Sequence, residues 1–179
     1  MLSTYYQNLT YYVEAKEAVE PVTDIALELD YQKGLAGIYS ALGLYYTAVE
    51  EDFDKGMQYL KNVSEIAKKT GNFLALWMAN YQMGSFVCHN FQFEESLACL
   101  QTSLDLSALA NNLMGMTQAR SSLAMNYNLW GKQDLAFQKS TEALETARKS
   151  GDVLALQPAY THHGMSCYYK GSLLEAENY

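Results

Sequence analysis

The chain has 179 residues, of which 49% are apolar, and it carries 12 Lys and Arg against 20 Asp and Glu, a net charge of −8. This length allows one globular domain or a short repeat array with a sizeable core, and the apolar share excludes a disordered chain. The acidic surplus argues against nucleic acid or an anionic membrane as the partner, because both attract cationic surfaces.

The three cysteines are too few and too scattered for a disulfide framework, so a reducing compartment is expected. No apolar run approaches the roughly 18 residues of a membrane span, and the first residues do not read as a secretory signal. We therefore predict a cytoplasmic location and no membrane partner. The cysteines are Cys88, Cys99 and Cys167.

In chain order, apolar spacing and turn signals predict helices throughout and no strand. Pro21 and Pro158 fall inside predicted helices, where each removes a hydrogen bond and favours a kink. The acidic run 50–54 lacks the spacing and the glycine of a calcium loop, so we interpret it as a solvated loop that supplies a helix N-cap. The predicted helices cover about 11–30, 32–49, 53–70, 72–90, 93–110, 112–130, 133–150, 152–170 and 172–179.

The turn signals recur with a fixed period. Gly71, Asn111 and Gly151 are spaced 40 residues apart, and each can take the left-handed conformation that ends a helix. Each is followed by a residue whose side chain can cap the next helix, namely Asn72, Asn112 and Asp152. Such self-similarity is typical of repeat proteins, in which neighbouring units bury each other's apolar faces.

Small residues recur in the first helix of each unit, where they let the paired helix approach closely. They are Gly43, Gly84, Ala124 and Gly164, and large residues such as Leu60 and Leu100 are expected to fill the gap between units. We predict a single solenoid over 1–179. It comprises a partial unit 1–30, units of about 31–71, 72–111 and 112–151, and a partial unit 152–179.

The two-helix unit resembles the tetratricopeptide repeat (TPR). The first full unit carries its pattern as Tyr39, Leu42-Gly43, Tyr46, Gly56, Leu60 and Val63. The period of 40 exceeds the usual 34 and the closing proline is absent, which resembles the long-helix variety found in bacterial multidomain signalling proteins. The resemblance implies an all-α fold, a right-handed α/α superhelix of stacked antiparallel helix pairs.

The resemblance also implies a non-catalytic module that binds a protein or a peptide, within a larger bacterial signalling or regulatory protein. Two alternatives remain open, a peptide-sensing regulator domain and an oligomerisation or spacer module. The last predicted helix is short, and Leu173, Leu174 and Tyr179 do not form a polar cap. We therefore expect either a piece of a longer repeat protein or a chain that associates end to end through its terminal helices.

The family's groove positions, transferred unit by unit, give a neutral lining of hydroxyl, aromatic and methionine side chains. No Lys or Arg lies between Lys69 and Arg120, so a basic clamp for a peptide carboxylate is missing and a neutral to basic partner is expected. Alternatively, these side chains only pack against the next unit. The predicted site residues are Ser40, Leu44, Thr47, Tyr81, Ser85, Cys88, Ser121, Met125, Asn128, Thr161, Met165 and Tyr168, with His89 and Gln82 flanking them.

No phosphate-binding glycine loop and no catalytic constellation is present in the sequence. Cys88-His89 and His162-His163 are the only close clusters of metal-ligand types, and they lie almost two repeats apart. Adjacent helix residues such as Cys88 and His89 point in different directions, which disfavours a catalytic pair. Cys167 is interpreted as a small core residue. We therefore expect no enzymatic activity, no metal and no cofactor.

Overall fold

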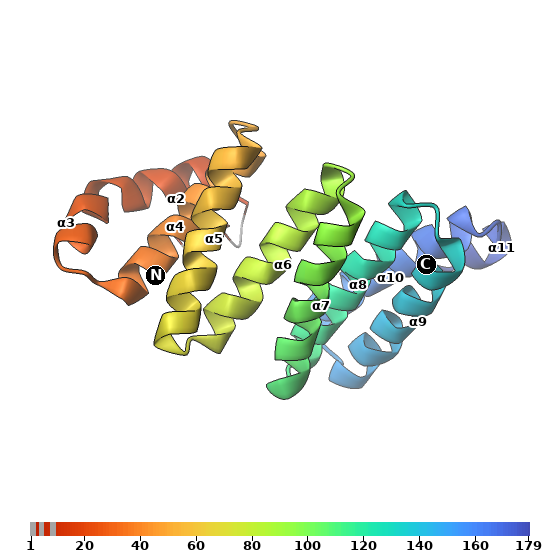
Figure 1. Cartoon of the computed structure of the whole chain (residues 1–179). Coiled ribbons are helices and arrows are strands. Elements are labelled where there is room, and N and C mark those ends of the chain that lie inside the picture. The colour runs from red at the N-terminus through yellow and green to blue at the C-terminus, as the bar shows by residue number, and fades with distance from the viewer. Residues whose placement is uncertain (1–2, 4–5, 8–9) are drawn as a thin grey trace. The chain divides into compact units, whose positions relative to one another are not determined.

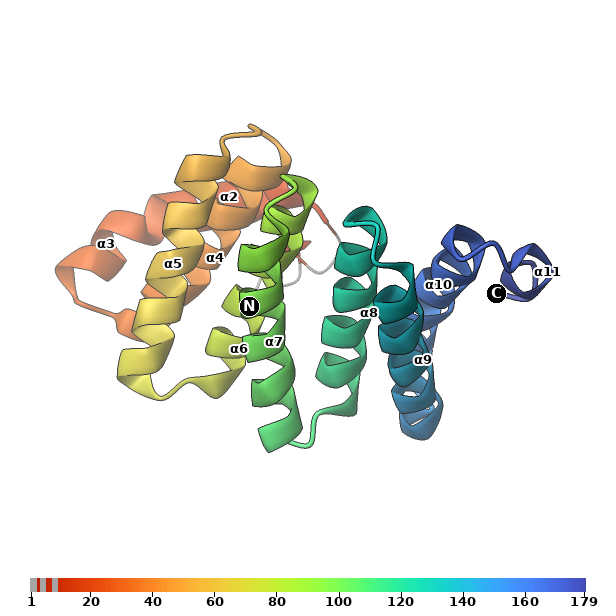
Figure 2. The same ribbon diagram turned by 45° about the vertical axis from the view of Figure 1, so that its right-hand side comes forward.

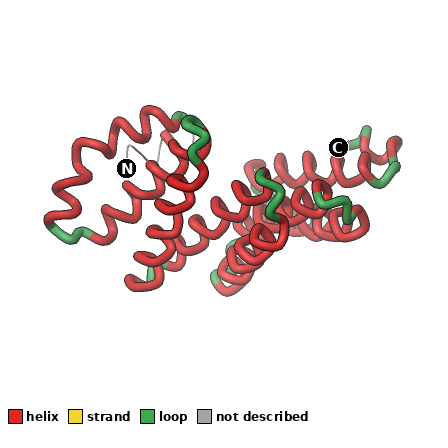
Figure 3. Tube along the Cα trace, turned by 45° about the horizontal axis from the view of Figure 1, so that its top comes forward, coloured by secondary structure: helices red, strands yellow, loops and turns green. Residues whose placement is uncertain are grey.

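The computed structural model describes residues 3, 6, 7 and 10–179, and every regular element in this part of the chain is a helix (Figures 1 and 3). The helices group into two compact units, Met1–Gln82 and Met83–Tyr179, which divide within one helix. Residues 1–2, 4–5 and 8–9 of the partial unit predicted over 1–30 lie outside the described residues. None of the described helices is long and apolar enough to cross a membrane.

The first unit contains a broken helix followed by regular ones. The helix predicted over 11–30 is interrupted at Pro21, which lies in the first turn of a short 3-10 segment because it has no N–H to donate to a continuing α-helix. The hydroxyl of Thr23 donates to the carbonyl of Val19 across this break, at 3.0 Å. The elements are α2 (Tyr12–Val19), η1 (Glu20–Val22), α3 (Thr23–Glu28), α4 (Gln32–Ala48), α5 (Phe53–Thr70) and the first turns of α6 (Phe73–His89).

Helices α4 and α5 pack side by side as an antiparallel pair, and α2 and α3 pack on α4 (Figure 1). Gly56 permits this close approach, because a Cβ there would lie 3.0 Å from the Gly43 carbonyl oxygen and 2.3 Å from a methyl of Thr47. The core of this unit is apolar and includes Leu35, Ile38, Leu42, Val63 and Ile66.

The second unit repeats the antiparallel arrangement. Helix α8 packs against α7, α9 and α10, and α10 also packs against α9 and α11 (Figure 2). Helix α10 continues through Pro158, so the proline does not end the helix. The elements after α6 are α7 (Phe93–Leu109), α8 (Leu113–Leu129), α9 (Gln133–Ser150), α10 (Val153–Tyr169) and α11 (Leu173–Ala176).

The repeated junctions have the predicted geometry. Gly71, Asn111 and Gly151 have φ values of 65°, 50° and 66°, in the left-handed region. Asn72, Asn112 and Asp152 each accept a hydrogen bond from a backbone N–H in the first turn of the next helix. In the acidic loop, the carboxylate of Asp52 accepts from the N–H of Lys55 at 3.1 Å, which confirms the predicted cap.

The small residues also have the predicted role. A Cβ at Gly43 would lie 2.9 Å from the Leu60 side chain, and one at Gly84 would lie 2.7 Å from the Leu100 side chain. Leu60 and Leu100 are fully buried, and each lies against the glycine of the paired helix in its own repeat. The helical repeat with small residues at fixed offsets is therefore present in both units.

Candidate functional site

A cleft of about 200 Å³ lies between α4 and α6 in the first unit. Each helix lines it with residues at positions i, i+3, i+4 and i+7, which fall on one helical face. Val63 of α5, Gln7, Leu74 and the N-cap residue Asn72 complete the lining. The stripe on α4 is Lys33, Ala36, Gly37 and Ser40, and the stripe on α6 is Ala75, Met78, Ala79 and Gln82.

The cleft combines an apolar floor with uncharged hydrogen-bonding groups. The hydroxyl of Ser40 donates to Oε1 of Gln7 at 3.1 Å, which fixes one side of the cleft. On the other side, Oε1 of Gln82 is buried and accepts no hydrogen bond from any described residue. A buried acceptor without a donor is unfavourable, so an N–H or O–H group entering the cleft would gain a hydrogen bond at Gln82. Among the described residues that line the cleft, Lys33 is the one that carries a charge.

The predicted site residues fall into three groups by exposure. The buried members serve packing: the Thr47 hydroxyl donates to the Gly43 carbonyl at 2.8 Å, and the Asn128 amide donates to Ser166 Oγ at 3.0 Å, which links α8 to α10. Buried are Leu44, Thr47, Cys88, Ser121 and Asn128; half-buried are Ser40, Tyr81, Ser85, Met125 and Met165; exposed are His89, Thr161 and Tyr168. Ser40 is the member of this set that lines the α4–α6 cleft.

Several half-buried and exposed members have defined neighbours. The ring of Tyr81 stacks on Trp77 with centroids 6.2 Å apart, and the His89 ring nitrogen lies 2.7 Å from the Ser85 carbonyl oxygen. Burial raises the pKa of the Cys88 thiol, which disfavours its reactive thiolate form. The role of the thirteen residues in binding stays a prediction, and for the buried ones direct contact with a partner would require the helices to move.

Thr161 lines a second, open hollow of about 610 Å³ on the second unit. Its hydroxyl donates to the Gln157 carbonyl in its own helix at 3.0 Å. The guanidinium of Arg148 lies 5.9 Å from the centroid of the Tyr160 ring, and its hydrogen bond to Tyr160 raises the pKa of Arg148. Asn178 and Tyr179 complete the lining.

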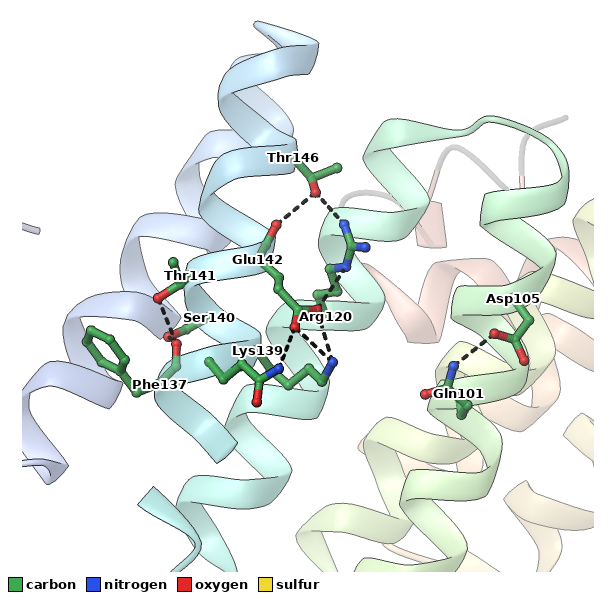
Figure 4. A network of polar contacts seen from close by, with 10 residues as sticks. Gln101, Asp105, Arg120, Phe137, Lys139, Ser140, Thr141, Glu142 and Thr146 are labelled. Atoms are coloured by element: carbon green, nitrogen blue, oxygen red, sulfur yellow. Dashed lines mark hydrogen bonds and ion pairs between the residues drawn. The ribbon is translucent and has the colours of Figure 1, made fainter. Parts of the chain in front are cut away.

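Arg120, which precedes the predicted groove residue Ser121, is paired with a carboxylate. Arg120 of α8 lies 3.5 Å from Oε2 of Glu142 on α9, and Lys139 contacts the same carboxylate at 3.0 Å (Figure 4). The guanidinium of Arg120 also donates to the hydroxyl of Thr146. Because Arg120 is neutralised in this way, it is not available to hold the terminal carboxylate of a peptide.

One cluster in the second unit was not found from the sequence. His163 and Cys167 of α10 and Glu175 of α11 place their ligand atoms within 4.8 Å of one another. The available signal was the spacing of four between His163 and Cys167, which puts both on one helical face. The adjacent pairs His162-His163 and Cys88-His89 are more conspicuous in the sequence. Burial lowers the pKa of His163, so the neutral imidazole is favoured.

No family model and no curated protein sequence matches the chain. Solved structures do match it, among them a protein of Podosopora anserina described as a kinesin light chain with nearly identical TPR-like repeats, and a point variant of that protein. The first is 16% identical, with a TM-score of 0.71, and the second is 17% identical, with a TM-score of 0.72. Each match covers 99% of this chain and 87% of the other.

The fold of this chain is therefore that of the TPR-like helical repeats. The predicted all-α solenoid of stacked helix pairs is confirmed by the helical architecture and by both matches. At this level of identity the likeness establishes the fold, and the function has to be argued from the surfaces of this chain.

Proposed function

We propose that this chain is a non-catalytic scaffold that binds a partner protein through an extended, neutral to basic peptide segment seated in the α4–α6 cleft. The observation that supports this most directly is the pair of matching helical stripes around the unpartnered Oε1 of Gln82. The 40-residue form of the repeat supports the further proposal that the scaffold belongs to a bacterial signalling or regulatory protein acting in the cytoplasm, without a nucleic-acid or membrane partner.

The size of the cleft favours a segment of a larger partner over a free small molecule. Its volume of about 200 Å³ is below the roughly 300–1,000 Å³ of typical small-molecule sites. It can take one anchor side chain together with the adjacent backbone, while the rest of the peptide lies along the surface of α4 and α6. A preformed helical cleft of this kind needs little ordering when the partner binds.

The charge of the chain favours a basic segment next to the anchor. The net charge is −8, which attracts cationic partners at long range and raises their association rate. The anchor itself is uncharged in this proposal, because Gln7, Ser40, Asn72 and Gln82 offer only neutral hydrogen-bonding groups. Lys33 at the cleft disfavours a cationic anchor directly beside it.

The test begins with peptides selected from a random displayed library against the intact 179-residue chain. The dissociation constant of each is then measured for the wild type and for Gln82→Leu, which removes the unpartnered acceptor while nearly keeping the side-chain shape. We expect binding to weaken at least tenfold in Gln82→Leu, with no loss in the free energy of unfolding, because an unsatisfied buried acceptor has been removed.

A second variant blocks the cleft by bulk. Nothing lies within 4 Å of a Cβ built at Gly37, so Gly37→Phe can be accommodated while it fills the space beside α6. The matched control is Glu65→Phe, at an exposed position of α5 outside the cleft lining. Selected peptides that bind both Gln82→Leu and Gly37→Phe as well as the wild type would refute the cleft as the binding site.

The peptide-sensing alternative differs in what a short peptide does by itself. In a sensor, the free peptide has to change the packing of the helices, which would alter amide hydrogen exchange far from the cleft. In a scaffold, we expect protection to increase only around α4 and α6. If the chain is a spacer module, we expect that the affinity of no selected peptide changes in Gln82→Leu or Gly37→Phe.

End-to-end self-association is a second candidate, supported by an apolar cleft at the amino-terminal helices. This cleft of about 700 Å³ is lined by residues of α2, η1, α3, α4 and the turn between α3 and α4, among them the exposed Val22, Ile25 and Leu29. Exposed apolar side chains also lie on α11, where Leu174 is 82% exposed. We propose that α11 of a second copy occupies the cleft, with the exposed Glu177 facing Lys33.

A further inference from the structure

The structure assigns a metal-binding role to the cluster at the junction of α10 and α11: we propose that His163, Cys167 and Glu175 bind Zn²⁺. This site lies in the second unit, does not rest on the proposed peptide binding and can be tested separately from it. His163 and Cys167 lie one helical turn apart and are 3% and 0% exposed, whereas Glu175 is exposed on the short helix that follows. The three potential ligand atoms lie within 4.8 Å of one another.

The hydrogen bonds of the neighbouring helix orient His163 for metal binding. Ser140 Oγ lies 2.9 Å from the Phe137 carbonyl oxygen and 2.9 Å from Nδ1 of His163. The hydroxyl has a single hydrogen. When it donates that hydrogen to the carbonyl, Nδ1 donates to Ser140. The neutral imidazole then carries its lone pair on Nε2, the nitrogen left to bind a metal.

Aromatic rings hold this imidazole in place. The Phe137 ring centroid lies 5.3 Å from that of His163, and the Tyr179 ring packs edge-on at 4.7 Å. Metal-binding histidines in proteins almost always have a partner on the second nitrogen that fixes the orientation of the ring. Ser140 and the two rings supply that support to His163, and no such set surrounds the exposed His89 among the contacts of the described residues.

The ligand types select the metal. One thiolate, one imidazole and one carboxylate match the preferences of Zn²⁺ and are poorly suited to Mg²⁺ or Ca²⁺, which prefer oxygen ligands. When Zn²⁺ binds, the Cys167 thiol loses its proton to solvent, and the thiolate and carboxylate together balance the double charge of the ion. A neutral complex is far less costly to bury than an isolated ion.

The geometry requires only a small movement of an exposed side chain. Ligand atoms around tetrahedral zinc lie roughly 3.5 Å apart, given bond lengths of about 2.0–2.3 Å. The present separations reach 4.8 Å, and Glu175, on the solvent side of the cluster, can close the difference by rotating its carboxylate inward. The same exposed side gives the ion a path into the site and leaves the fourth position to water.

The test is a titration of the metal-free, untagged 179-residue chain with Co²⁺ in the presence of a phosphine reductant. Co²⁺ bound by a thiolate in a tetrahedral site gives a near-ultraviolet charge-transfer band together with visible absorption. We expect both at one equivalent in the wild type, and we expect Zn²⁺ to abolish them by displacing Co²⁺. We expect Zn²⁺ also to raise the melting temperature, because it joins α11 to α10.

Three variants each remove one ligand, and each has a matched control. Cys167→Ser and His163→Gln should lose the charge-transfer band, and Glu175→Gln should raise the Co²⁺ dissociation constant at least tenfold. The controls Cys88→Ser, His162→Gln and Glu177→Gln should bind as the wild type does.

Absence of a stoichiometric thiolate band in the wild type would overturn the proposal, as would a band that persists in Cys167→Ser. Because Cys167 and His163 are buried, their variants can lose stability for reasons unrelated to metal. Glu175 is exposed, so unchanged Co²⁺ affinity in a folded Glu175→Gln variant would by itself refute the site.

Discussion

At the residue scale, glycines of this chain have opposite roles in different helices. Gly56 lies where α5 meets α4, and a Cβ there would press on the backbone of Gly43 and Thr47. Gly37, in contrast, has open space around it in the middle of α4. The first glycine is required by packing, whereas the second only weakens the helix through its backbone entropy.

This contrast predicts opposite effects of one substitution. Gly56→Ala should lower the free energy of unfolding by about 1–3 kcal/mol, because the overpacked Cβ cannot be accommodated without moving backbone. Gly37→Ala should raise it by about 0.5–1 kcal/mol through helix propensity. Urea unfolding followed by circular dichroism measures both, and equal effects of the two substitutions would contradict the close approach of α4 and α5.

A second prediction at this scale concerns Tyr45 and the pH dependence of stability. Its hydroxyl donates to the Glu50 carboxylate, and this hydrogen bond is the largest cause that raises the pKa of Tyr45 to about 12. The unfolded chain therefore releases this proton at lower pH than the folded chain does. The contribution of Tyr45 to stability is complete below about pH 10 and is lost as the pH rises through about 12.

Replacing the acceptor should remove this effect. In Glu50→Gln, we expect the pKa of Tyr45 to fall toward its ordinary value, so that stability declines less steeply between about pH 10 and 12. Alkaline unfolding measures the change in stability, and the ultraviolet absorbance of tyrosinate measures the change in the titration. The control is Glu51→Gln in the same loop, which should leave the titration as in the wild type.

At the element scale, a residue in the left-handed conformation follows the last helix before each of the three repeated junctions. Asn111 occupies the position that Gly71 and Gly151 take at the other two junctions. We expect Asn111→Ala to lower the free energy of unfolding by about 1 kcal/mol, because a Cβ without a local hydrogen-bonding group disfavours this conformation. Asn111→Gly should keep or raise the free energy of unfolding. The control Gln101→Ala, at an exposed position of α7, should leave it nearly unchanged. Urea unfolding of the three variants measures these effects.

The helices themselves were predictable because their ends have local causes. The left-handed residues at the junctions and the capping side chains that follow them determine where α6, α8 and α10 begin, within a residue or two of the predicted bounds. The prediction of one continuous helix over 11–30 was wrong. Whether a proline such as Pro21 interrupts a helix depends on the turn in which it lies, and the sequence alone does not show this. Pro158 has the same chemistry and lies inside a helix that continues through it.

At the scale of the whole molecule, the repeat made the fold predictable and left the candidate site largely unpredicted. Gly84 and Leu100 recur because every seam has to be filled, so they report packing in each unit. Exposure is not periodic in the same way. Thr47 and Asn128 occupy the family's groove positions and are nonetheless buried by their neighbours. The sequence placed Gln82 only beside the groove positions, because nothing in it shows that the acceptor of this side chain lacks a partner in the cleft.

The prediction at this scale concerns the proposed end-to-end self-association and its effect on mass in solution. In sedimentation velocity over a concentration series, we expect the mean mass of the wild type to rise and that of Leu174→Lys and Ile25→Lys to remain at the monomer value. The control is Leu109→Lys. Leu109 is 84% exposed and Leu174 is 82% exposed, but Leu109 lies on α7, outside the proposed contact. An equal effect of Leu109→Lys, or a wild type that is monomeric throughout, would refute the end-to-end contact.

The two tryptophans divide between the two units, with Trp77 stacked on Tyr81 in the first and Trp130 stacked on Phe93 in the second, beneath the ammonium group of Lys132 at 3.2 Å. Each half of the chain thus contains its own tryptophan. Replacing either indole with phenylalanine leaves tryptophan emission from a single half, so unfolding or ligand addition can be followed in each half without any external label.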